Sequence, residues 1–136
     1  MKDYDELYRI ADGARKMAHA PYSNITVGAA LLTKSGKIYT GANIENAAFS
    51  PSVCAERVAF FDAIHAGERD FIAIAVAGGE KNKEAKEVFS PCGVCRQVMA
   101  EFCDGDFLVI TYDGKEERVK TLNDIFPDTF SGKNLD

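Results

Sequence analysis

The order of apolar patterns in this sequence predicts an α/β fold, a three-layer α-β-α sandwich in which helices cover both faces of a five-stranded mixed sheet. Three observations support this prediction. Residues 3–18 and 54–66 carry apolar side chains at helical spacing. The run FIAIAVAGG over residues 71–79 is almost wholly apolar, as expected of a central strand buried on both faces. Asp113-Gly114 separates two short strand-like runs and predicts a hairpin, so the last two strands should be antiparallel.

The remaining elements follow in chain order. Pro21 closes the first helix, and the runs VGAALLT (27–33) and IYTGANI (38–44) flank a Gly-containing turn, which predicts a β-hairpin. Ser90 as N-cap and Pro91 as first helical residue predict a helix start, with the helix running from about Cys92 to Phe102. The strands FLVITY (107–112) and EERVK (116–120) follow, and Thr121 with Asp124 suggests a short last helix.

Length and composition limit what the chain does. Its 136 residues fit a single domain over residues 1–136, and 46% apolar with 27% charged residues is typical of a soluble globular protein. The net charge of −5 and the lack of a dense basic run argue against a nucleic-acid partner and favour a small neutral substrate. No apolar run is long enough to cross a membrane, and the N-terminus MKDYDELYRI lacks the apolar core of a secretory signal.

Without export, the expected location is the cytoplasm, where thiols stay reduced. The four cysteines, Cys54, Cys92, Cys95 and Cys103, are therefore better explained by metal binding or catalysis than by disulfides. Cys92 and Cys95 are three residues apart, which places both on one face of a first helical turn. Cys54 approaches from the start of another predicted helix. Three thiolates can hold one Zn²⁺ per chain and leave its fourth tetrahedral position open.

Glu56 lies two residues after Cys54 and can face the open zinc position without being a ligand. A carboxylate there can take a proton from a water molecule and deliver it to a ring nitrogen and a leaving amine. This is the arrangement that zinc deaminases share, with three cysteines as one variant of the ligand set.

Other interpretations of these motifs remain open. A Cys-x-x-Cys pair in a cytosolic protein is often a redox pair or half of a structural zinc site. A closed four-cysteine site would need Cys103, but Cys103 is eight residues past Cys95, about 12 Å further along the same helix. Arg57, next to Glu56, can offset the thiolate charge by hydrogen bonds to sulfur, or it is a surface arginine.

At these residues the sequence resembles the cytidine deaminases of the homotetrameric, three-cysteine zinc class. The similarity runs over APYSNITVGAALLTKSGKIYTGANIENAAFSPSVCAER and SPCGVCRQVMAEF. The resemblance implies a cytidine deaminase-like fold and hydrolytic deamination of cytidine and deoxycytidine in pyrimidine salvage. It further implies a homotetramer with a small nucleoside substrate.

The resemblance also assigns residues. Cys54, Cys92 and Cys95 would bind zinc, Glu56 would move protons, and Arg57 would balance the cysteine charge. The substrate-binding residues would be Asn43 and Glu45 on the ribose hydroxyls, Ala55 on the base edge, Ile25 on the pyrimidine, and Phe130 in a neighbouring subunit's pocket. Ile25 departs from the family, which usually has Phe there, so ring stacking is lost at this position. Phe49 stands where Tyr is frequent, and His19 and His65 match no ligand position.

Two rival functions follow from the same motifs. A blasticidin-type deaminase shares Cys-Ala-Glu and Pro-Cys-x-x-Cys, but the Asn-Ile-Glu-Asn segment over residues 43–46 is not expected in it. A zinc-stabilised binding module without catalysis would need a fourth protein ligand, for which the sequence offers no good candidate.

Overall fold

The computed structural model describes residues 4–136, so the predicted helix start at Asp3 lies outside the described residues. The strands are β1 (Ile25–Thr33), β2 (Ile38–Ala42), β3 (Phe71–Glu80), β4 (Leu108–Tyr112) and β5 (Glu117–Thr121). The helices are α1 (Asp5–Ala14), α2 (Ala55–His65), α3 (Gly93–Phe102) and α4 (Leu122–Ile125), with short 3₁₀ turns at Arg15–Met17 and Gly132–Leu135. The predicted order of elements is thus found, with boundaries that mostly differ by one or two residues.

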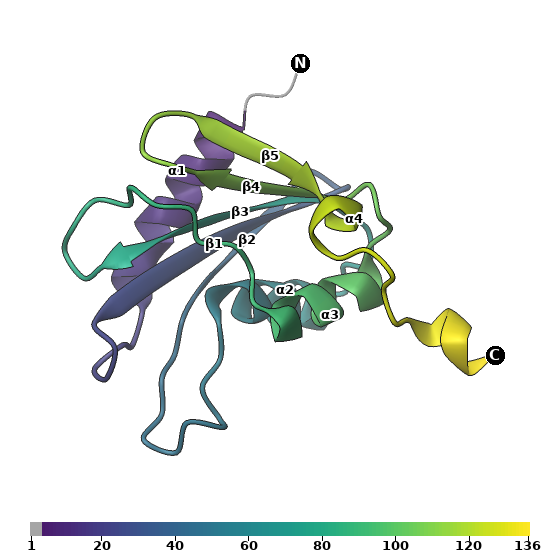
Figure 1. Ribbon diagram of the computed structural model, residues 1–136, viewed down its shortest axis with the longest axis horizontal. Coiled ribbons are helices and arrows are strands. Elements are labelled where there is room, and N and C mark those ends of the chain that lie inside the picture. Colours follow the sequence, from purple (N-terminus) through teal and green to yellow (C-terminus); the bar gives the residue numbers. More distant parts are fainter. Residues whose placement is uncertain (1–3) are drawn as a thin grey trace.

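The five strands form one mixed sheet in the order β2-β1-β3-β4-β5 (Figure 1). β1 is antiparallel to both of its neighbours, β2 and β3. β3 and β4 are parallel, because the chain crosses over through α3 before it returns to the sheet. β3 lies between β1 and β4 and is thus internal to the sheet, as its apolar sequence predicted. Residues 73–78 of β3 are buried.

The structure corrects the predicted fold class in how the strands pair. The prediction named a mixed sheet without saying which strands are parallel, and the structure shows that β3 and β4 are the parallel pair. The prediction also centred the last turn on Asp113-Gly114. β4 and β5 do run antiparallel, but Tyr112 pairs with Glu117, two residues further on than that turn requires. The reason is that the Asp113 carboxylate accepts hydrogen bonds from the amides of Lys115 and Glu116, which moves the turn to Gly114-Lys115.

Helices cover both faces of the sheet, in three layers (Figure 1). α1 packs on the face where β1 and β3 present small residues, so that Leu7 and Ala11 lie against Ala30 and Ala75. α2 and α3 cover the opposite face, whose core includes Phe60, Ile74 and Met99 among other buried residues. No helix within residues 4–136 has the length and apolar character needed to cross a membrane.

The packing of α2 on β2 fixes where the functional segments lie. A Cβ atom at Gly41 would come within 2.3 Å of the Ala55 carbonyl oxygen and 2.6 Å of the Ala59 amide. Only a glycine lets the first turn of α2 approach the strand this closely. The start of α2 is thereby held on the sheet, and the start of α3 lies beside it.

Candidate zinc and catalytic site

Three cysteines from two helix starts form one cluster. Cys54 is the N-cap of α2, Cys92 is the N-cap of α3, and Cys95 lies in the first turn of α3. Their Sγ atoms all lie within 4.8 Å of one another, and those of Cys54 and Cys92 are 3.7 Å apart. Helix N-termini favour thiolate over thiol, because the free amides and the helix dipole stabilise negative charge there.

This cluster fits a zinc ion. Zn–S bonds of about 2.3 Å in tetrahedral geometry place two sulfurs about 3.8 Å apart, close to the observed separation of Cys54 and Cys92. Among residues 4–136 the cluster contains three potential ligands, and Cys103, at the far end of α3, is not one of them. Three protein ligands with an open fourth position are typical of a catalytic site and not of a closed structural one.

Arg57 is directed at the sulfurs, as the sequence predicted it could be. Its Nη2 donates a hydrogen bond to Cys54 Sγ at 3.5 Å. Hydrogen bonds from Cys95 and Arg57 outweigh the effect of burial and lower the pKa of the Cys54 thiol to about 5. The Cys95 thiol has a raised pKa, first because it is hydrogen-bonded to Cys54 and then because it is buried. The Arg57 Nε is buried and has no hydrogen-bond partner in the described part of the chain.

Glu56 lies in the first turn of α2, and only 4% of its surface is exposed. Burial disfavours its charged form and raises the pKa of its carboxyl group to about 7, and the nearby Cys54 thiolate acts in the same direction. A carboxyl group with a pKa near neutrality can both accept and donate a proton at physiological pH. Its position and its pKa are those of a proton-transfer group.

A cavity of about 380 Å³ opens in front of this cluster, within the size range of small-ligand pockets. It brings together most of the residues predicted from the sequence, and its lining includes Ile25, Asn43, Glu45, Cys54, Ala55, Glu56, Arg57 and Cys92. Residues that the sequence did not assign to the site also line it: Ser23, Val27, Ser52, Val53, Val76, Phe89 and Ser90.

Asn43 and Glu45 follow the end of β2 and both line the cavity, whereas Ile44 between them is exposed. The Asn43 side chain bridges to β1: Oδ1 accepts from the Val27 amide at 2.8 Å, and Nδ2 donates to the Ile25 carbonyl at 2.9 Å. The Glu45 carboxylate accepts hydrogen bonds from the amides of Tyr22 and Ser23 and from the Ser23 hydroxyl. The bond from the Ser23 hydroxyl is the main cause that lowers the pKa of Glu45, so this side chain is a fixed acceptor.

Two predicted site residues do not line this cavity: Cys95, which is buried within the cysteine cluster, and Phe130. Phe130 lies near the C-terminus, its side chain is 57% exposed, and its carbonyl oxygen accepts a hydrogen bond from Gln97 Nε2. His19 and His65 are also exposed and do not belong to the cysteine cluster.

Arg96 is a residue of the site that sequence reasoning missed. It follows Cys95 directly, and its guanidinium donates to the Pro91 carbonyl at 2.7 Å and to Ser90 Oγ at 2.8 Å. It also donates to the Ile125 carbonyl at the end of α4. These bonds tie the loop before Cys92 to the C-terminal segment. The position of Arg96 next to a predicted ligand was the only signal in the sequence.

Comparison with known proteins agrees with this geometry. Residues 1–111 match the family model described as the cytidine and deoxycytidylate deaminase zinc-binding region. The chain belongs to this deaminase family. A cytidine deaminase from Sporosarcina psychrophila is 43% identical over 134 residues, which cover 98% of this chain and 95% of the relative.

Structural comparison leads to the same family. The crystal structure of cytidine deaminase from Burkholderia pseudomallei matches with a TM-score of 0.85 and 43% identity, over 95% of this chain and all of that one. A blasticidin-S deaminase from Bacillus cereus is more distant, with 32% identity over 74% of each chain. The chain is thus similar to cytidine deaminases over nearly its whole length, and to the blasticidin-S enzyme over a shorter part.

Proposed function

We propose that this member of the deaminase family hydrolyses cytidine and deoxycytidine to uridine and deoxyuridine with release of ammonia, as a step of pyrimidine salvage. The strongest support for this function is the position of Glu56. Glu56 is buried at the wall of a nucleoside-sized cavity, beside three cysteines that fit one zinc ion. A redox pair would not need this carboxylate, and a closed structural zinc site would need a fourth ligand.

The reaction forms a C4–O bond from water and breaks the bond between C4 of the cytosine base and its exocyclic amino nitrogen. Cys54, Cys92 and Cys95 would hold the zinc ion, which supplies a Lewis acid that makes water nucleophilic near neutral pH. Glu56 takes a proton from the attacking water and gives it to N3 of the base. A second proton then goes through Glu56 to the departing amine, which leaves as ammonia.

The rest of the cavity orients the nucleoside. The Glu45 carboxylate, already fixed by Ser23, can accept hydrogen bonds from ribose hydroxyls, and the Asn43 amide lines the same cavity. Backbone groups at Ala55 contact the base edge, and Ile25 adds apolar contact. Arg57 offsets the charge of the three thiolates, so that the metal retains its Lewis acidity.

The first experiment separates this function from its relatives. Purified protein is tested with cytidine, deoxycytidine, CMP, adenosine and blasticidin S, and the zinc content of the same sample is measured. We expect turnover of the two nucleosides with about one zinc per chain. Preferred turnover of blasticidin S, or zinc without any deamination, would contradict the proposal and would favour the blasticidin-type enzyme or a binding module.

We also infer that the enzyme is a cytoplasmic homotetramer in which Phe130 of one chain helps to close the cavity of another. The ring of Phe130 is more than half exposed, and Leu135 nearby is 77% exposed. Exposed apolar side chains of this kind are commonly covered by a partner. A cavity that is open on one side is a natural place for a residue from a second chain.

The assembly has its own test. Sedimentation should give about four chains per particle. Phe130→Ala should raise KM for cytidine about tenfold, because one aromatic contact with a base contributes about 1–3 kcal/mol. Mixing Phe130→Ala chains with inactive Glu56→Gln chains should restore some sites. A fully active monomer, or no rescue despite subunit exchange, would end the shared-cavity idea but not the deaminase assignment.

A further inference from the structure

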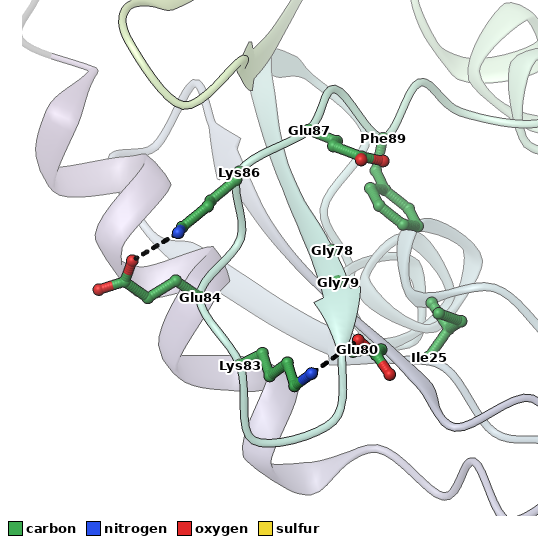
Figure 2. Close-up of a pocket in the computed structure, with 9 residues that line it drawn as sticks. All are labelled: Ile25, Gly78, Gly79, Glu80, Lys83, Glu84, Lys86, Glu87 and Phe89. Atoms are coloured by element: carbon green, nitrogen blue, oxygen red, sulfur yellow. Dashed lines mark ion pairs between the residues drawn. The ribbon is translucent and has the colours of Figure 1, made fainter.

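Phe89 is the one aromatic residue among the described residues that line the catalytic cavity. Ile25 contributes aliphatic contact to the same cavity but has no ring. Figure 2 shows the Phe89 side chain extending from the loop after β3 toward Ile25, beside Gly78 and Gly79. Phe89 and Ile25 also line the neighbouring groove of about 500 Å³, so the two side chains stand at the boundary between groove and cavity.

The end of β3 is shaped to receive this ring. A Cβ atom at Gly78 would come within 2.5 Å of both Cγ and Cδ2 of Phe89, and within 2.9 Å of Cδ1. Three ring atoms at such distances mean that the ring lies directly on the backbone of the strand. Glycine inside a strand often marks a close approach by another group, and here that group is Phe89.

The backbone that carries the ring is also held in place. Phe89 packs against the core beneath α2 and α3, and it directly precedes Ser90. The Ser90 hydroxyl accepts a hydrogen bond from Arg96 at 2.8 Å, which holds the backbone that carries the ring. Phe89 is therefore a partly buried and well-anchored aromatic side chain, three residues before the cysteine Cys92.

We propose that Phe89 provides the aromatic surface against which the pyrimidine ring of the substrate packs, and that Gly78 is required so that the ring can reach this position. The proposal rests on the proposed deaminase function. A pyrimidine has an apolar face that prefers contact with another ring, and such contacts with a base are worth about a 5- to 150-fold change in affinity. Phe89 is thus a substrate-binding residue that determines specificity for a planar base.

The test compares Phe89→Leu and Phe89→Tyr with wild-type enzyme. Phe89→Leu should raise KM for cytidine about tenfold, with a much smaller change in kcat, and Phe89→Tyr should restore most of the loss because it retains the ring. Phe71→Leu is the matched control. Phe71 is also a half-buried aromatic side chain, but its ring packs on Phe60 at 5.1 Å in the core, away from the cavity.

Binding is measured separately from turnover, as cytidine affinity by calorimetry on zinc-loaded Glu56→Gln protein with and without Phe89→Leu. We expect about tenfold weaker binding with Phe89→Leu. Gly78→Ala should weaken binding to a similar degree, because the ring has to move. Unchanged KM and affinity in folded Phe89→Leu, or an equal increase in Phe71→Leu, would overturn the proposal. Wild-type enzyme that deaminates no cytidine would instead refute the proposed function itself.

Discussion

Helices α2 and α3 each begin at a cysteine in an extended conformation, and each carries an arginine in its first turn, but the two arginines bind different partners. Arg57 donates to the Cys54 sulfur at 3.5 Å. Arg96 donates instead to the Pro91 carbonyl, at 2.7 Å, and to other uncharged oxygens of the loop and of α4. One arginine thus contacts a sulfur of the cysteine cluster, where we propose that it compensates charge, whereas the other holds the backbone of the loop.

The surroundings of the two helix starts explain this difference. Ala55 and Glu56 are buried, because α2 packs closely on β2 at Gly41. Cys92 and Gly93 at the start of α3 are exposed. The start of α2 is held by packing on β2, whereas the exposed part of the α3 start is held in addition by the hydrogen bonds of Arg96. The four substitutions below test this distinction, from the largest expected effect to the smallest.

Loss of a metal ligand should have the largest effect, even at the exposed helix start. Cys92→Ala removes one of three sulfurs, so we expect most of the zinc and nearly all of the deaminase activity to be lost. Zinc per chain is measured by metal analysis after gel filtration. Cys103→Ala, at the other end of α3, is the control and should retain zinc. If Cys103→Ala lost the zinc and Cys92→Ala kept it, the ligand assignment would be wrong.

Glu56→Gln should retain zinc and fold but lower kcat by at least about 10²-fold, the lower end for loss of a general acid–base group. The amide has nearly the same shape as the carboxyl group, but it cannot transfer protons. The measurement is steady-state turnover of cytidine in protein with confirmed zinc content. Turnover close to that of wild type in a zinc-loaded sample would remove Glu56 from the mechanism.

The sequence predicted the parts of this site that depend on local pattern. The two helix starts, the three thiols and Glu56 follow from helical periodicity and from the spacing of Cys54, Cys92 and Cys95. The predicted N-cap of α3 was off by two residues, because Cys92 and not Ser90 is the N-cap, whereas the helix itself begins at Gly93, one residue after its predicted start. Ser90 fits the usual preference for a capping hydroxyl, but in the structure its hydroxyl accepts a hydrogen bond from Arg96 instead.

The features that were missed depend on contacts between distant parts of the chain. Arg96 reaches Ile125, 29 residues away in the sequence, and no local pattern indicates this contact. The Phe89 ring packs on Gly78, although a charged loop separates the two residues in the sequence. The glycine pair Gly78-Gly79 at the end of β3 was the only sign in the sequence that a side chain packs closely on this strand. The turn at Asp113 was misplaced because a side-chain hydrogen bond, and not the Asp-Gly pair alone, set its register.

Removal of the Arg57 charge should weaken the enzyme less than loss of Glu56. Arg57→Ala should lower kcat/KM by about 10- to 100-fold with zinc still bound, the range for groups that support metal ligands. Arg57→Gln should lose less, because an amide can still donate a hydrogen bond to sulfur. Both variants are assayed at saturating zinc. Equal and negligible effects of the two changes would show that the Arg57 charge does not support the reaction.

Arg96 should act on stability more than on chemistry, because its partners are backbone and hydroxyl oxygens. Arg96→Ala leaves several acceptors unpaired, so we expect the free energy of unfolding to fall by about 1–3 kcal/mol, with less than a tenfold loss of kcat/KM in the folded, zinc-loaded enzyme. Arg96→Lys should recover only part of this stability, because an ammonium cannot replace the planar guanidinium fork.

Arg69→Ala is the matched control, since Arg69 donates to the Ile64 and Glu68 carbonyls at an exposed position. Its unfolding free energy should change by no more than about 0.5 kcal/mol. Denaturant unfolding and zinc-saturated kinetics on the same samples decide the outcome: if Arg96→Ala reduced activity as strongly as Arg57→Ala without loss of stability, the two arginines would not have separate roles.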